Sequence, residues 1–446
     1  MPPVADAVIP AMPPRPPRAL STLGLLRVAL SNSLAALDEE LFDEPIVERR
    51  FVWGRVFVVS DPAGVRHVMQ DNVDNYPRIE PIRRVFAFSA GSGMLSAEGE
   101  TWRQHRRLLN PVLDHRAVLA DLPVLVELTQ ELVRRLSDLP PPREINVGDV
   151  FTHLITAFTG RLFAADERAI DPVLYRLGQY PGRYSLSDFV RLPGQRRGGR
   201  SEANEFHALF DRLIAARRAP DYAGPQDLLW RMANARDRET GETLPAIELR
   251  DEALTLGATS ATPLRVFPWL WYLLAIHPEI EARLHTELDQ VLGGRMPGAA
   301  DIPRLIYLRQ IIDETLRLYP SAPTMLRSAA TEDQICGRRV PRKAVIGVLP
   351  WVVHRHRKLW NDPDRFDPER FTAAQTAQRS RYAYLPFAIG PHVCIGASLA
   401  LVEIVVVTAI LAQRFRFRLV PGQAIEPLAW TNLHPKGGIR VTVEAR

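Results

Sequence analysis

Cysteine is scarce in this sequence, because only Cys336 and Cys394 occur among its 446 residues. A single disulfide cannot stabilise a chain of this length, so the cysteine content excludes a disulfide-stapled fold. It favours instead a reducing compartment in which both thiols stay free.

Long apolar runs are also missing. The two longest are Val266–Ile276 and Leu399–Ala412, and Glu403 interrupts the second. Both fall short of the roughly 18–20 residues that cross a bilayer. The first residues lack the basic stretch and apolar core of a secretory signal. We therefore expect a soluble, cytoplasmic protein without a membrane span.

A continuous basic stripe is absent too, although 56 Lys and Arg residues stand against 51 Asp and Glu residues. The arginines occur as scattered pairs without interleaved aromatic residues, which argues against nucleic-acid binding. A local basic patch for an acidic protein partner stays open, and Arg103, His105 and Arg107 are the candidates for it.

Proline, by contrast, is abundant, with 38 residues in 446. Several of these prolines lie in residues 1–18, which we expect to form a flexible, extended tail. The remaining residues 19–446 contain no internal repeat, and we expect them to form a single domain.

The spacing of apolar residues predicts a mainly helical chain. Helices are expected over residues 22–42, 102–136, 149–164, 201–218, 246–276, 278–293, 306–318 and 395–414. A hairpin is expected over 46–59, a long loop over the proline- and glycine-containing residues 76–101, and short strands near the C-terminus. Because the strands do not alternate regularly with the helices, the fold class is mainly α with small β-sheets.

One cysteine lies in a distinctive setting. Cys394 is flanked by Gly390 and Gly396 and precedes a strongly apolar helix. The N-terminal end of a helix favours a thiolate, glycines permit close approach of a bulky planar ligand, and Phe387 could shield the sulfur from water. A lone thiolate suits a single axial metal bond better than a zinc or iron–sulfur site. The alternative for an isolated cysteine is a small apolar core residue.

The spacing Phe387-x-x-Gly390-x-x-x-Cys394-x-Gly396 resembles the haem-binding signature of the cytochrome P450 family. The resemblance extends from the hairpin near Ile46 to the C-terminal strands. It implies the cytochrome P450 fold, a haem b cofactor, and the Cys394 thiolate as axial ligand of the haem iron.

The resemblance also identifies a structural triad. Glu314 and Arg317 match the family's Glu-x-x-Arg helix, and Arg370 matches the arginine that joins this pair in a buried triad. A second Glu-x-x-Arg copy, Glu131 and Arg134, is expected to lie on the surface.

Four further residues match positions that bind the haem propionates in the family. Trp102 and Arg106 form the Trp-x-x-x-Arg pattern, which places both on one face of a helix. Arg327 lies at the matching strand position, and His392 replaces the more common arginine two residues before the cysteine. The charge of His392 would depend on pH.

The oxygen-activating helix of the family is where this sequence departs from the pattern. The spacing to Pro278 places the family's threonine at Thr262, but the acid position is then Ala261 and the second threonine is Pro263. Pro263 lacks an N–H and is expected to open the helix locally.

Three functions stay open on this sequence. The first is a monooxygenase that inserts oxygen into a hydrophobic fatty acid or terpenoid, with Thr262 in proton delivery. The second is a peroxide-driven or non-oxygenating haem-thiolate enzyme, and the third is a haem-binding sensor. For the first, the resemblance implies a separate ferredoxin or flavodoxin as electron donor, because no reductase segment is recognised in the chain. We expect a monomer.

Overall fold

The computed structural model describes residues 8–29, 31–52, 54–165, 200–259, 261–430 and 432–446. Its helices are α1 Thr22–Ala29, α2 Pro62–Arg66, α3 Glu80–Ala90, α4 Gly99–Leu109, α5 His115–Ala120, α6 Leu122–Ser137, α7 Val147–Phe163, α10 Arg200–Arg217, α11 Leu228–Ala233, α12 Ala246–Thr259, α13 Ala261–Ile276, α14 Pro278–Val291, α15 Ile306–Leu318, α16 Pro350–Val353, α17 Ala373–Gln378 and α18 Ala397–Ala412. The strands are β1 Ile46–Phe51, β2 Gly54–Val59, β3 Glu144–Asn146, β4 Met325–Ser328, β5 Asp333–Ile335, β6 Arg338–Val340, β7 Val345–Val348, β8 Phe415–Leu419, β9 Pro427–Ala429, β10 Leu433–Pro435 and β11 Arg440–Ala445.

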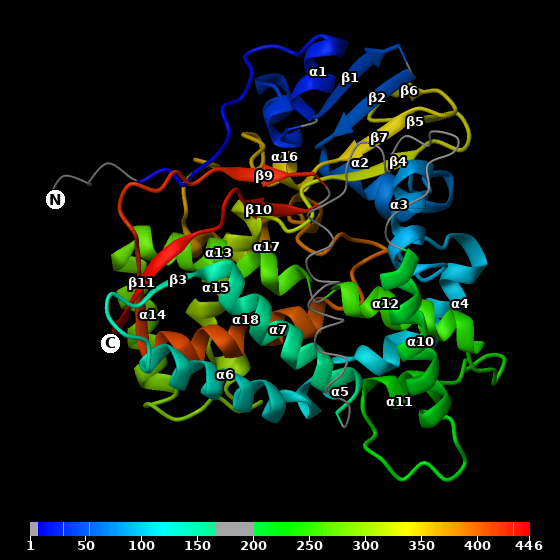
Figure 1. Cartoon of the computed structure of the whole chain (residues 1–446). Helices are drawn as coiled ribbons and strands as arrows, with labels where there is room; N and C mark the ends of the chain where they lie inside the picture. Colours follow the sequence, from blue (N-terminus) through cyan, green and yellow to red (C-terminus); the bar gives the residue numbers. More distant parts are fainter. Residues whose placement is uncertain (1–7, 30, 53, 166–199, 260, 431) are drawn as a thin grey trace, which may run out of the picture.

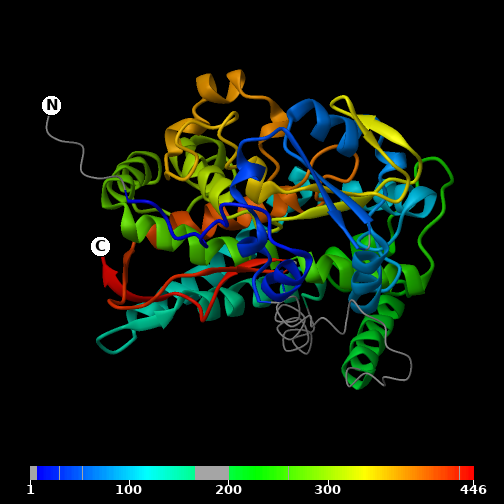
Figure 2. The same ribbon diagram turned by 90° about the horizontal axis from the view of Figure 1, so that it is seen from above.

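The strands form small, separate sheets, as expected for this fold class. The largest has the order β1-β2-β7-β4, with β2 and β7 parallel and the other two pairs antiparallel. It lies at the top of Figure 1, with the long helices α6, α7 and α18 below it. Figure 2 shows the β1–β2 hairpin in blue beside the yellow strands of the same sheet. The remaining sheets are β3-β11-β8, β9-β10 and β5-β6.

The helical core is built around α18. Every residue from 402 to 412 of this helix is buried, because its sequence is apolar on all sides. The similarly apolar α13 packs against α18 and against α7, where the rings of Phe267 and Phe151 stack with their centroids 4.2 Å apart. No helix in the described part of the chain is both long and apolar enough to cross a membrane.

Three predicted elements differ from the structure. The helix expected over residues 102–136 is divided into α4, α5 and α6, because Pro111 interrupts the helix and the Asp114 side chain caps a new one. The helix expected over residues 22–42 ends at Ala29, because the Asn32 side chain bonds the backbone of Leu34 and Pro427 and so favours a turn. The loop expected over 76–101 contains helix α3. Pro81 lies in the first turn of that helix, where a missing N–H costs nothing.

The N-terminal segment differs from the expected flexible tail over its described part. The backbone of Ala11 accepts a hydrogen bond from Tyr319 at 2.8 Å and donates one to Tyr272 at 3.0 Å. Arg15 pairs with Asp364. These contacts hold the segment against the helical core, while residues 1–7 lie outside the described chain. The proposed domain boundary at residue 18 stays a prediction.

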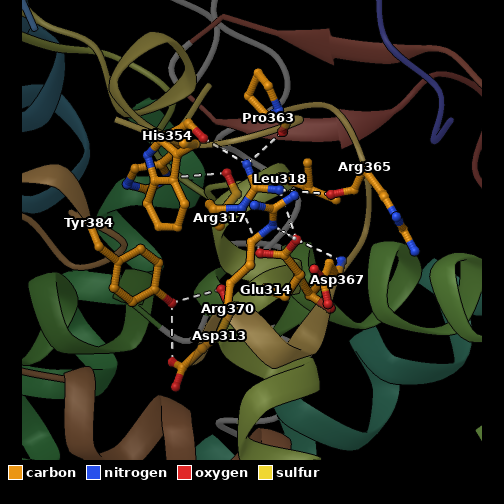
Figure 3. A network of polar contacts seen from close by, with 12 residues as sticks. Asp313, Glu314, Arg317, Leu318, His354, Pro363, Arg365, Asp367, Arg370 and Tyr384 are labelled. Carbon is orange, nitrogen blue, oxygen red and sulfur yellow. Dashed lines mark hydrogen bonds and ion pairs between the residues drawn. The ribbon is translucent and has the colours of Figure 1, made fainter. Parts of the chain in front are cut away.

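A buried ion-pair network joins α15 to the irregular segment that follows α16 (Figure 3). Arg317 and Glu314 are completely buried, and the guanidinium donates to both carboxylate oxygens at 2.5 and 2.8 Å. The same guanidinium donates to the carbonyls of His354, Pro363 and Arg365. The Nε of Arg370 lies 3.4 Å from Glu314, so the expected triad is confirmed. Glu131 and Arg134 are exposed, as expected for the second copy.

We predict that Arg317→Leu lowers the free energy of unfolding by about 3–5 kcal/mol, because it leaves Glu314 buried without its main cation. The matched control is Arg339→Leu, which removes an exposed ion pair to Glu332 and should cost less than about 1 kcal/mol. Chemical unfolding of both variants provides the measurement, and equal losses would contradict a structural role for the buried pair.

Candidate functional site

The loop before α18 holds Cys394, which is half-buried. The Cys394 N–H donates to the carbonyl of Phe387 at 2.8 Å, which folds the loop back on itself. Burial raises the pKa of the Cys394 thiol, while the Gly396 N–H and the Arg106 guanidinium oppose that rise. The groups of the protein therefore stabilise a thiolate only in part, and a bound metal cation would complete its deprotonation.

The two glycines of this loop have different tasks. Gly390 has a φ of 75°, and a Cβ there would lie 2.0 Å from the carbonyl oxygen of Met69. Gly390 therefore permits the close approach of the Met69 backbone, whereas the sequence suggested the close approach of a planar ligand. Gly396 is buried and caps the N-terminus of α18. Phe387 is half-buried against the main core.

His354 connects the cysteine loop to the ion-pair network. Its Nε2 accepts the Leu385 N–H at 2.7 Å, and its Nδ1 donates to the Arg317 carbonyl at 3.1 Å. Burial and the nearby Arg317 guanidinium lower the pKa of His354 to about 3. The imidazole is therefore neutral at pH 7, with its proton on Nδ1. No sequence motif marks this histidine, because its role depends on hydrogen bonds to residues that are distant in the sequence.

The expected propionate-binding residues come together beside the cysteine loop. The rings of Trp102 and His392 lie 4.0 Å apart between centroids. Arg106, one turn after Trp102 on α4, donates to the carbonyl of Val393 at 2.8 Å. Arg327 on β4 is only 7% exposed, and its charge acts directly on His392.

This corner of the site carries an excess of buried positive charge. Burial, followed by the nearby Arg78, lowers the pKa of Arg327 to about 10, so the guanidinium stays charged at pH 7. Burial and the guanidinium groups of Arg78 and Arg327 lower the pKa of His392 to about 4, so this imidazole is neutral. Glu98 pairs with Arg78 at 2.7 Å, and sequence reasoning missed this pair because no motif marks it.

The same corner fits an anionic ligand. Within the described residues, Arg106 and Arg327 form no ion pair and donate only to carbonyl oxygens, and the buried Nδ1 of His392 has no hydrogen-bond partner. Unpaired buried cations are costly, so such a site requires an anion. The two carboxylates of a haem meet this requirement.

The structure describes the junction of α12 and α13 only in part near Thr262, the expected oxygen-activating residue. Thr262 is half-buried, and its carbonyl accepts from Ser321 at 3.5 Å. Ser260 and the side chain of Ala261 lie outside the described part, so the predicted opening at Pro263 stays a prediction.

A small cavity of 20 Å³ lies between α12, α13 and α18. Pro263 and Leu256 line it on one side, and Gly396 and Glu403 line it on the other. Glu403 is completely buried, and burial raises the pKa of this carboxyl group to about 8. Glu403 is therefore largely protonated at pH 7.

The expected basic patch on α4 is not a free surface. His105 is completely buried between Glu248 and Glu252. Arg107 pairs with Asp237 and Glu100, and Arg103 pairs with Asp74. The prediction that His105 faces a partner protein is wrong, because the acidic start of α12 packs against it.

We predict that Gly390→Ala lowers haem content and thermal stability, because the added Cβ collides with the Met69 carbonyl. Gly422→Ala is the matched control, since Gly422 has a φ of 77° but open space around its Cβ. The control should lose only the conformational cost of about 1–2 kcal/mol. Equal effects in thermal unfolding and haem quantification would show that backbone strain, not the collision, is decisive.

We further predict that protonation of His354 destabilises the fold in acid. Its pKa is about 3 in the folded protein and about 6.5 when exposed, so the unfolded state binds the extra proton between these values. Stability therefore falls as pH decreases below about 6.5, by about 2 kcal/mol between pH 7 and pH 5 from this group.

His354→Gln should be less stable than the parent at pH 7 but should have the flatter pH dependence in urea unfolding. His115→Gln controls for the loss of an exposed imidazole. Parallel pH profiles of the parent and His354→Gln would contradict the account of His354.

Comparison with known proteins gives a consistent result. A family model described as Cytochrome P450 matches residues 13–440. Cyclooctat-9-en-7-ol 5-monooxygenase of Streptomyces melanosporofaciens is 31% identical over 95% of this chain and 95% of its own length. Pentalenene oxygenase of Streptomyces avermitilis is 32% identical over 65% of this chain and 64% of its own length.

Solved structures agree on the fold. The heme domain of cytochrome P450DA superposes with a TM-score of 0.82 at 23% identity and covers 98% of both chains. A mutant of the same heme domain gives a TM-score of 0.83. The mainly helical fold with small sheets is thereby confirmed.

Proposed function

This chain belongs to the cytochrome P450 family of haem-thiolate oxidoreductases, and we propose that it inserts one oxygen atom from dioxygen into a terpenoid-like hydrophobic molecule. The Cys394 loop, beside two arginines that form no ion pair among the described residues, is the observation that carries this proposal. The names of relatives that act on cyclooctat-9-en-7-ol and pentalenene favour a terpenoid over a fatty acid.

In this proposal each residue of the site has a defined task toward the haem. Cys394 would bind the haem iron, since Cys336 is exposed. Arg106 and Arg327 would neutralise the propionates, and Trp102 and neutral His392 would donate N–H groups. Phe387, Gly390 and Gly396 shape the cysteine loop.

When bound, the haem iron supplies the activation of dioxygen. The task of the chain is to deliver protons to the reaction and to keep bulk water away from it. We assign Thr262 to proton delivery through its hydroxyl group. Buried apolar residues such as Met94 and Leu256 agree with a hydrophobic substrate.

The electron donor in this proposal is a separate ferredoxin or flavodoxin, and the enzyme works as a cytoplasmic monomer. Val393, next to Cys394, is 37% exposed, so the cysteine loop reaches the surface and offers a short path for an electron. Both cysteines are free thiols, which agrees with a reducing compartment.

A peroxide-driven or non-oxygenating enzyme is the second candidate, because Ala261 and Pro263 replace the acid and the second threonine of the family pattern. Parallel assays with NADPH and surrogate electron donors, and with peroxide alone, separate the two. Turnover with peroxide only would refute the electron-dependent monooxygenase.

We predict that Cys394→Ser abolishes the red-shifted Soret band of the reduced carbon monoxide complex, whereas Cys336→Ser keeps it. The reason is that this band requires a thiolate on the iron, and Cys336 lies exposed on the surface. Persistence of the band in Cys394→Ser would refute the ligand assignment. A spin-state titration of the parent against terpenes and fatty acids then tests the substrate class.

A further inference from the structure

A carboxylate–imidazole–carboxylate chain leads from the surface into α12. The Glu248 side chain is one-third exposed, and its Oε2 lies 2.9 Å from Nε2 of His105. The Nδ1 of His105 lies 2.6 Å from Oε1 of Glu252. His105 and Glu252 are completely buried. The three groups therefore form a continuous hydrogen-bonded path from solvent to the interior.

The chemistry of this path favours proton transfer. An imidazole can take up a proton at one ring nitrogen while it releases the proton on the other. Burial alone would lower the pKa of His105, but the carboxylates of Glu252 and Glu248 raise it. Burial also raises the pKa of Glu252, despite the opposing effect of His105. A proton is thus retained in the cluster, and two short contacts allow it to move.

The inner end of the path has polar atoms without partners. Oε1 of Glu252 also accepts the Met94 N–H at 2.7 Å, while its buried Oε2 has no hydrogen-bond partner among the described residues. The same holds for Oγ1 of Thr255, one turn further along α12. Gly93 packs so closely that a Cβ there would lie 2.3 Å from this hydroxyl oxygen.

The charge of the neighbouring Asp251 contributes to the raised pKa of Glu252, but the hydrogen bonds of Asp251 are structural. Asp251 accepts the N–H and the hydroxyl of Ser92 at 2.8 and 2.9 Å and contacts Arg250. Its hydrogen bonds hold the loop after α3 onto α12. Asp251 has no contact with His105 among the described residues, so it lies outside the path.

We propose that Glu248, His105 and Glu252 form a proton-entry relay that supplies Thr262 in place of the acid missing at Ala261. A proton enters at Glu248, passes through the two nitrogens of His105 and reaches Glu252, which releases it beside Thr255. Thr262 follows Thr255 by seven residues in the sequence, so in this proposal water molecules carry the proton between the two hydroxyl groups. This inference rests on the proposed monooxygenase function.

The competing explanation is a clamp that only fixes α4, with Trp102 and Arg106, onto α12. A clamp and a relay differ in one measurable respect. Peroxide brings its own protons and oxygen atom, so peroxide-driven turnover needs the geometry of the site but no proton supply from solvent. Electron-driven turnover needs both.

The test uses the haem-loaded variants Glu252→Gln, His105→Gln and the partly exposed Glu248→Gln, with Asp251→Asn as the matched control. The carbon monoxide band first establishes that each variant is folded and thiolate-ligated. For the three relay variants we expect product per NADPH to fall at least about tenfold. Hydrogen peroxide should account for the lost electrons, and peroxide-driven turnover should stay within about twofold of the parent. Asp251→Asn should give as much product per NADPH as the parent.

Two outcomes of these assays would overturn the relay. Equal losses in the electron-driven and peroxide-driven assays would assign the cluster to a clamp. If Glu403→Gln lowers product per NADPH and Glu252→Gln does not, proton delivery belongs to Glu403, the other buried carboxyl group.

An infrared readout tests the relay without turnover. The C=O stretch of protonated Glu252 should disappear in Glu252→Gln, and its exchange in deuterated water should slow at least about tenfold in His105→Gln if His105 is the entry route. Unchanged exchange would overturn the relay. A parent enzyme that keeps its thiolate band but gives no product in either assay would refute the proposed function instead, and the infrared result would still decide the relay.

Discussion

The buried ion pair between Arg317 and Glu314 is the interaction on which the site depends. It lies at the centre of a chain of contacts that runs from α15 through His354 to Leu385, at the start of the cysteine loop. Two full charges in the interior are tolerated because every guanidinium nitrogen of Arg317 and both carboxylate oxygens of Glu314 are hydrogen-bonded. The network therefore fixes the backbone that presents Cys394, although no charged group of the network touches the thiol.

Around this rigid base, the charges are distributed unevenly. The edge formed by α4, β4 and the cysteine loop holds the half-buried Arg106 and the buried Arg327, which have no carboxylate partner among the described residues. The start of α12 instead holds the partly exposed Glu248 and the buried Glu252 on either side of His105. The first arrangement suits an anionic cofactor edge, and the second suits the movement of protons. Arg106 and His105 are adjacent on α4, so this helix would link the proposed cofactor edge to the proposed proton path.

Residue patterns predicted the elements that depend on local rules, and they failed where tertiary contacts decide. The β1–β2 hairpin and the apolar final helix follow from alternation and hydropathy, whereas the buried triad was expected from the resemblance to the cytochrome P450 family. Helix α3 was missed because Pro81 begins it and Gly91 caps its end, so these two residues do not mark a loop. The burial of His105 could not be predicted, because its two carboxylate partners lie more than 140 residues away in the sequence.

The central claim is that the chain uses this site to place one atom of dioxygen into a hydrophobic molecule. Turnover under isotopically labelled dioxygen, with an electron donor and a terpene selected by spin-state titration, tests it most directly by mass spectrometry of the product. The account predicts one labelled oxygen atom per product molecule. A product without label, or with oxygen taken from water, would contradict it.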